Sequence, residues 1–231
     1  AMTVYRRAVE VLGVCLLGVH FVGSFSGCKM AGVVAHGLFP QMVKAQYHLP
    51  QRATLVWVED PSSQFADLYM KDRIAVEVDR LLAHHAGLTT VPPGGVTDLM
   101  QELGDDFDRA GIDQIGRRLK AEQVVYMSIT DIDLYPQPGL LHPTAQVEVK
   151  VVDVINKKRM FPTTVLGMQG QVQSLAPPGY KLKVRLSARG IPDHKVGLRR
   201  AVEHQLALRI ARDASRLFFD YLPRQPGEPP G

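Results

Sequence analysis

Two carboxylates are the first residues in this 231-residue chain whose types and spacing could do chemistry. Asp131 and Asp133 are one residue apart in a segment with the composition of a β-strand, so both side chains would point to the same side. Paired carboxylates can act as general acid and general base, which makes a hydrolase one reading of the chain. No nucleophile or metal ligand stands beside them in the sequence, so a strand end that meets solvent explains them equally well.

A second acidic stretch resembles a calcium-binding loop but lacks two of its ligands. Asp106, Asp108 and Gly111 fall at the first, third and sixth positions of such a loop, whereas Ala110 and Arg117 occupy the fifth and twelfth. Those two positions need oxygen ligands. The sequence also has no glycine-rich phosphate loop, no paired-histidine zinc motif and no serine elbow. We therefore expect no metal, no cofactor and no catalytic residues.

The N-terminal stretch has the organisation of a secretory signal peptide. Arg6 and Arg7 precede an apolar run from Val11 to Val22, and small residues follow. A transmembrane anchor is the alternative, because Ala8 to Phe25 approaches the ~17–25 residues that span a bilayer. The uninterrupted apolar part is shorter than that, so a signal peptide is favoured.

The end of this stretch resembles the lipobox of bacterial lipoproteins. The resemblance implies that Phe25, Ser26 and Gly27 are recognised by the signal peptidase and that Cys28 is lipidated and becomes the new N-terminus. Several acyl chains, at about 0.8 kcal/mol per buried methylene, would anchor the protein durably in a membrane. Lys29, rather than an aspartate, resembles lipoproteins sent to the outer membrane.

Charge and cysteine content exclude some functions. The net charge of +4 is too small to indicate nucleic-acid binding. Acidic groups outnumber basic ones between Gln51 and Met160, and the reverse holds from Lys181 to Arg224, which could favour an anionic membrane or partner or simply pair within the domain. Both cysteines lie within the first 28 residues, so no disulfide can link two parts of the chain that follows.

The remaining pattern predicts an α/β (α+β) domain: a mixed central sheet of four to six strands packed by helices, including a long C-terminal helix. Alternating Val147, Val149 and Val151 indicate one packed face, and Trp57 is expected in the core. We expect a signal peptide at 1–27, a lipidated tether at 28–50, one domain at 51–222 and a disordered tail at 223–231. The expected strands are 53–58, 88–91, 123–134, 144–153 and 159–165 with an edge hairpin at 167–186, and the expected helices are 72–86, 98–103, 112–121 and 196–221.

Three phrases give this order of elements a family resemblance. Thr54 to Asp60, Gly116 to Val125 and Val151 to Asp153 look like the periplasmic domain of the CsgG and LpoB type of envelope lipoproteins. That group includes curli secretion channels and activators of peptidoglycan synthases, without a catalytic site in either. The resemblance implies a membrane-anchored, non-catalytic lipoprotein facing the periplasm, whose domain binds another envelope protein or copies of itself.

Three hypotheses about function follow. For the lipoprotein hypothesis, the segment with Asp131, Asp133 and Tyr135 is the expected partner-facing loop. The first alternative is an envelope hydrolase that uses Asp131 and Asp133. The second is a periplasmic small-molecule binding module, which would require a deep apolar pocket lined by Trp57 or Tyr126.

Overall fold

The computed structural model describes residues 41–135, 142–163, 179–186 and 198–223. Cys28 and the three residues expected before it in the lipobox lie outside these ranges. Lys44–Tyr221 forms one compact unit. Among the described helices, none combines the length and the apolar character that crossing a bilayer requires.

The sheet is mixed and has six strands. Its order is β2-β1-β3-β4-β5, with β6 also paired to β4. β1 is parallel to both β2 and β3, whereas β4 is antiparallel to β3, β5 and β6. The strands are β1 (Thr54–Glu59), β2 (Thr90–Val91), β3 (Gln123–Asp133), β4 (Thr144–Asp153), β5 (Lys158–Phe161) and β6 (Tyr180–Arg185).

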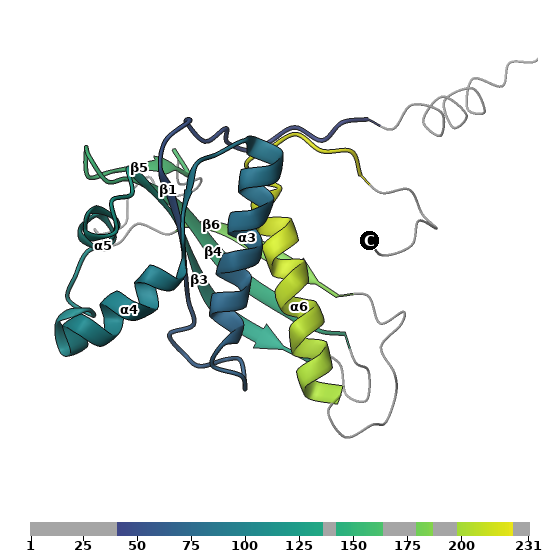
Figure 1. Cartoon of the computed structure of the whole chain (residues 1–231). Helices are drawn as coiled ribbons and strands as arrows, with labels where there is room; N and C mark the ends of the chain where they lie inside the picture. Colours follow the sequence, from purple (N-terminus) through teal and green to yellow (C-terminus); the bar gives the residue numbers. More distant parts are fainter. Residues whose placement is uncertain (1–40, 136–141, 164–178, 187–197, 224–231) are drawn as a thin grey trace, which may run out of the picture. The chain divides into compact units, whose positions relative to one another are not determined.

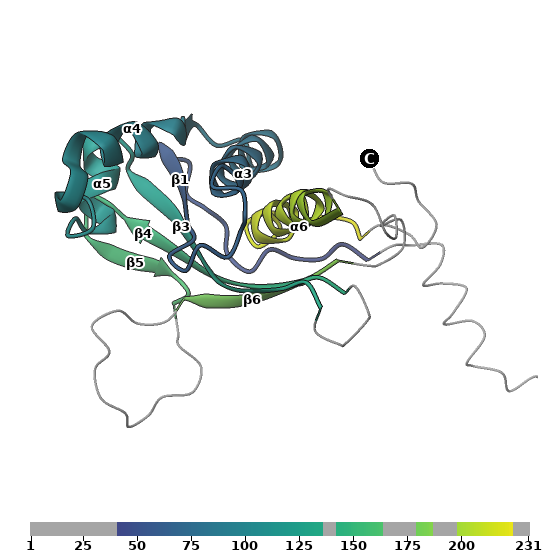
Figure 2. The same ribbon diagram turned by 90° about the horizontal axis from the view of Figure 1, so that it is seen from below.

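Helices cover both faces at the parallel end of the sheet. α3 (Met70–Ala86) and α6 (Leu198–Ser215) lie side by side over one face (Figures 1 and 2). α4 (Gly94–Leu103), the short 3-10 turn η1 (Gly104–Asp106) and α5 (Ile112–Arg118) connect β2 to β3 on the other. The connection from β1 to β2 and the connection from β2 to β3 run in opposite directions across the sheet. Because connections between parallel strands are right-handed, these two must pass over opposite faces.

Each face has its own hydrophobic core. The larger core joins α3 and α6 to the sheet through the row Val147, Val149 and Val151, and helix residues such as Leu206 and Ile210 are fully buried against it. The smaller core lies under α4 and α5 and contains Leu55, Trp57, Leu99, Phe107, Ile115, Ala121, Val124 and Val154. The mixed sheet, the packed valine row and the burial of Trp57 confirm the sequence-based predictions.

Four predicted helix boundaries are wrong. α3 begins at Met70 rather than Asp72, and α5 ends at Arg118 rather than Ala121, before Lys120 with its positive φ. α4 begins at Gly94 rather than Asp98, because Pro93 already has helical dihedral angles and proline is favoured at the start of a helix. α6 ends at Ser215 rather than Tyr221. The carbonyl of Leu217 accepts hydrogen bonds from the backbone N–H groups of Gln46 and Tyr47, at 2.8 and 3.0 Å, so the buried apolar stripe continues in non-helical backbone.

Candidate functional site

A groove lies where β1 extends beyond its neighbour β2. β2 pairs only with the first two residues of β1, Thr54 with Thr90 and Leu55 with Val91. The other edge of β1 is paired with β3 along its whole length, from Thr54 to Glu59. β1 lies between β2 and β3 in the sheet. The chain leaves β1 through α3 over one face to reach β2, and it then reaches β3, on the other side of β1, through α4 and α5 over the opposite face. The carboxyl end of such a strand is the usual ligand site of open α/β sheets.

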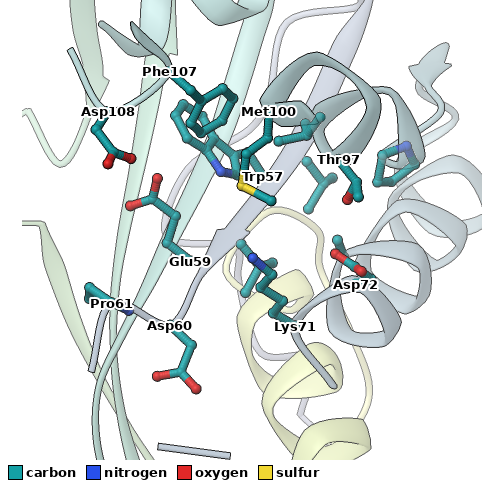
Figure 3. A pocket seen from close by; sticks show the side chains of 15 residues that line it. Trp57, Glu59, Asp60, Pro61, Lys71, Asp72, Thr97, Met100, Phe107 and Asp108 are labelled. Carbon is teal, nitrogen blue, oxygen red and sulfur yellow. The ribbon is translucent and has the colours of Figure 1, made fainter. Parts of the chain in front are cut away.

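The groove has a volume of about 310 Å³ and lies between two helices. Four consecutive β1 residues, Val56–Glu59, form its floor, although their side chains alternate between the two sheet faces. This lining places the groove beside the strand rather than above one face of the sheet. The walls come from α3, α4 and the segment after η1, and include Lys71, Asp72, Ala75, Val96, Thr97, Met100, Phe107 and Asp108 (Figure 3).

An adjoining hollow of about 290 Å³ extends the groove along the segment that leads into α3. The two share Asp60, Lys71, Asp72, Thr97 and Met100. The rim of the second hollow is apolar and open to solvent, because the side chains of Leu68 and Tyr69 are 75% and 74% exposed. The two hollows together form one groove with a polar inner part and an apolar rim, which we call the β1 groove.

Aromatic packing holds Trp57 in the groove floor. Trp57 is only 5% exposed and meets Tyr126 and Phe107 edge to face, with ring centroids 5.2 and 5.6 Å apart. The Tyr126 hydroxyl donates a hydrogen bond to the Glu59 carboxylate. Burial, followed by this bond to Glu59, raises the pKa of Tyr126, so the phenol stays protonated and orients Glu59.

The inner part of the groove is acidic. Glu59 and Asp108 point to the same side of it in Figure 3, and Asp72 faces it from the first turn of α3. Lys71 is the one basic side chain among the lining residues, and no described residue forms an ion pair with it. The β1 groove therefore carries a net negative charge and favours a positively charged ligand.

Asp60 has a structural role beside this acidic surface. Its two carboxylate oxygens accept the backbone N–H groups of Gln64 and Phe65 at 2.9 and 3.0 Å, which closes the turn after β1. That turn presents the exposed Leu68 and Tyr69 at the rim. Asp60 therefore shapes the groove and has fewer free lone pairs for a ligand than Glu59 or Asp108.

The predicted loop residues lie apart from the β1 groove. Asp131 accepts a 3.3 Å hydrogen bond from the Gln146 side chain, and Asp133 accepts the Tyr135 backbone N–H at 2.9 Å. A register shift between Ile129 and Asp131 precedes them at the far end of β3. The structure thus brings Asp131, Asp133 and Tyr135 close to one another, and none of the three lines the groove.

The residues of the incomplete calcium pattern have other surroundings. Asp106 forms an exposed ion pair with Arg109 at 3.2 Å, while Asp108 lines the β1 groove. In the described ranges, no group of three or more His, Cys, Asp or Glu side chains has the arrangement of a metal site.

Comparison with known proteins finds similar solved structures and no family. No protein-family model and no curated protein sequence matches the chain. Lipoprotein GNA1162 from Neisseria meningitidis has a similar structure: it is 15% identical, the match covers 69% of this chain and 99% of that one, and the TM-score is 0.41. The chain is thus similar in structure to a protein described as a lipoprotein.

Two further solved structures show the same likeness. A PelC dodecamer from Paraburkholderia phytofirmans is 10% identical, with 74% of this chain and 94% of that one covered and a TM-score of 0.39. The LpoB C-terminal domain from Salmonella enterica is 18% identical, with 69% and 96% covered and a TM-score of 0.32. An LpoB domain, the type that the sequence resemblance named, is thus among the structures similar to this chain.

Sequence reasoning missed most residues of the β1 groove, although it named Trp57 as a possible pocket residue and Asp108 in the incomplete calcium pattern. Glu59 and Asp60 were available as a signal, because they are polar residues directly after the first parallel strand, where α/β sheets bind ligands. Leu68, Tyr69 and Met100 carried no such signal, since an exposed apolar residue and a core residue look alike in a sequence.

Proposed function

We propose that this protein is a non-catalytic lipoprotein of the bacterial envelope, anchored to the membrane through Cys28 and facing the periplasm. Its α/β domain binds another envelope protein through the β1 groove. The signal-peptide pattern of residues 1–27 supports export, and the Lys29 that follows the cysteine supports an outer-membrane location. The observation that carries the binding role is the exposed apolar rim of Leu68 and Tyr69 beside a strand edge that β2 leaves unpaired.

The rim is better suited to a protein than to a substrate. Contiguous exposed apolar side chains next to a groove are typical of protein interaction sites. Tyrosine and methionine are enriched in interfaces, which fits Tyr69 and Met100. Tyr135 is also exposed, so the loop with Asp131 and Asp133 remains a second proposed contact surface.

Crosslinking in living cells tests the binding role. A photo-reactive amino acid replaces Tyr69 in the full chain, and a matched control replaces Ile155, which is 63% exposed after the end of β4. We expect a discrete crosslinked protein from position 69 that disappears when Leu68→Asp is added and that position 155 does not give. Equal crosslinking from the two positions, or none from position 69, would contradict the proposal.

Lipid labelling tests the anchor separately. Cells that express the wild-type chain or Cys28→Ala are fed labelled palmitate. We expect label in the wild type alone, and a Cys15→Ala control that keeps the label. Incorporation that persists in Cys28→Ala would remove the anchor from the proposal while leaving the binding role to be judged by crosslinking.

A small-molecule binding role is the second candidate. Trp57 lines the groove, and about 310 Å³ is at the lower end of the roughly 300–1,000 Å³ of ligand pockets. The lining carries Glu59, Asp72 and Asp108, so it differs from the deep apolar pocket that this alternative required and would select a small cation instead. A mixture of small amines that raises the melting temperature of the full chain, without any crosslink from position 69, would favour this candidate.

A further inference from the structure

The backbone of β1 presents unpaired groups to the β1 groove. In a parallel ladder, the N–H and C=O of alternate residues face alternate neighbours. The Thr54 N–H donates to the Thr89 carbonyl on the β2 side at 3.0 Å, and the Ala53 carbonyl accepts the Gln123 N–H on the β3 side at 3.1 Å. Val56 and Val58 therefore turn their backbone groups to the β2 side.

β2 cannot continue along these groups. It is followed by Pro92 and Pro93, which have no N–H to donate to β1, and the chain then enters α4. Within the part of the chain that the structure describes, no strand lies beside Val58 on this side. Val58 lines the groove, and no described backbone group outside the sheet bonds to it, so its N–H and C=O can pair with an extended segment that enters the groove.

The dimensions of the groove suit an extended chain. Val56–Glu59 spans roughly 10–13 Å at about 3.3 Å per residue, which is room for three or four residues of a strand. α3 forms one wall and α4 the other, so a segment that lies between them takes the place of a longer β2 (Figure 3). Its side chains would alternate toward the two walls.

Charge indicates which segment fits. Glu59 and Asp108 lie on one side, and Asp72 lies on α3, against the single ammonium of Lys71. The adjoining rim offers Leu68, Tyr69 and Met100 to apolar side chains. A strand that alternates basic and aliphatic residues satisfies both surfaces.

The geometry points to β-strand addition: the β1 groove takes an extended segment of the partner protein, rich in alternating Lys or Arg and aliphatic residues, which pairs with the free edge of β1. This inference rests on the proposed function and specifies how the partner is recognised. The pairing of Leu55 with Val91 already uses the Val56 N–H, so the Val56 carbonyl and both backbone groups of Val58 are left for the segment. Hydrogen bonds to these groups provide affinity, and the acidic wall selects basic side chains.

A defined peptide and one backbone amide test the inference. The probe is an acetylated hexapeptide of alternating Lys and Val, titrated into the full chain in detergent micelles, and amide hydrogen exchange is followed by NMR. At saturation we expect exchange at Val58 to slow more than tenfold. Trp57 and Glu59 are the internal controls, because their N–H groups already face β3 and their exchange should stay unchanged.

Two further probes separate strand pairing from charge. One version of the peptide is N-methylated at every Lys and another at every Val. Because alternate N–H groups of a strand face opposite edges, one of these versions places its methyl groups against β1, and its affinity should fall more than tenfold. Glu59→Gln and Asp108→Asn should each weaken the unmethylated peptide about twofold to fivefold, as expected for partly exposed charges. Glu122→Gln, an exposed change outside the groove, serves as the matched control.

The outcomes divide clearly. Three results would each overturn strand addition: binding without slower exchange at Val58, binding of both methylated peptides as tight as that of the unmethylated peptide, or binding of a Glu/Val peptide as tight as that of the Lys/Val peptide. Saturable competition by methylammonium alone, with no effect at Val58, would also overturn it and indicate a cation pocket. If position 69 crosslinks in cells and any of these results is obtained, the proposed binding of an envelope protein stands and strand addition falls. If Val58 is protected by the peptide but position 69 gives no crosslink, the proposed binding of an envelope protein falls and strand addition at the β1 groove stands.

Discussion

Gly116→Ala tests how tightly α5 is packed behind the β1 groove. A Cβ at this position would lie 2.6 Å from Cγ2 of Val154 and 2.7 Å from Cγ2 of Val124. Both distances are far below ordinary van der Waals contact. The two valines are buried and stiff at χ1, so neither can easily rotate away.

Two opposing effects set the magnitude. Replacing a helical glycine with alanine gains about 1 kcal/mol of helix propensity. Overpacking a well-packed core costs about 1–3 kcal/mol, and two contacts below 3 Å argue for the upper part of that range. We therefore expect a net destabilisation of about 1–2 kcal/mol, which lowers the melting temperature of a domain of this size by roughly 2–8 °C.

Thermal and urea unfolding of the full chain measure this effect. Gly94→Ala in α4 is the matched control, because no atom lies within 4 Å of its added Cβ, and it should be neutral or slightly stabilising. Adding Val154→Ala to Gly116→Ala removes one clash, so the double variant should be more stable than the sum of the two single effects. A Gly116→Ala protein as stable as wild type would refute this account of the packing.

Two further predictions concern charged groups. Glu203 is 1% exposed and paired with Arg199 at 2.8 Å, so Arg199→Ala should lower the free energy of unfolding by about 1–3 kcal/mol. Arg209→Ala, in an exposed pair on the same helix, should lower it by only about 0.3–0.5 kcal/mol. Equal urea midpoints for the two variants would contradict this prediction. Hydrogen bonds from the Asn156 backbone and side chain hold the pKa of Asp153 below its usual value. The ionised carboxylate therefore stabilises the fold at any pH above the unfolded pKa of about 3.9. This stabilisation is lost as the pH falls through the lower pKa of the folded protein. The stability gap between wild type and Asp153→Asn should therefore be widest near neutral pH and narrow below about pH 4, and a gap of constant size from pH 7 to pH 3 would argue against it.

The strand and helix types could be predicted because they depend on local periodicity. Alternation through Val147, Val149 and Val151 fixes which face of β4 is packed, and the prediction of Thr144–Asp153 matches the observed strand. The end of α6 could not be predicted in the same way. It depends on Gln46 and Tyr47, which donate to the Leu217 carbonyl from a segment far away in the sequence.

The β1 groove depends on contacts that no local pattern reveals. Its lining comes from β1, the turn before α3, α3 itself, α4 and the segment after η1. Which of these side chains meet is decided by the crossover directions and by the length of β2. Trp57 was correctly expected in the core, and its place in the groove floor follows from β2 ending at Val91.

The short β2 also explains how an open strand edge can be tolerated. Unpaired edges invite pairing with any extended chain, so proteins usually cover or charge them. Here α3 and α4 flank the open edge beside Val58, and Glu59 and Asp108 make its surroundings acidic. An apolar or acidic strand that approaches this edge therefore meets either two helix walls or like charge. The same features that block unselective pairing leave room for a basic extended segment, so protection of the edge and selection of a partner follow from one arrangement.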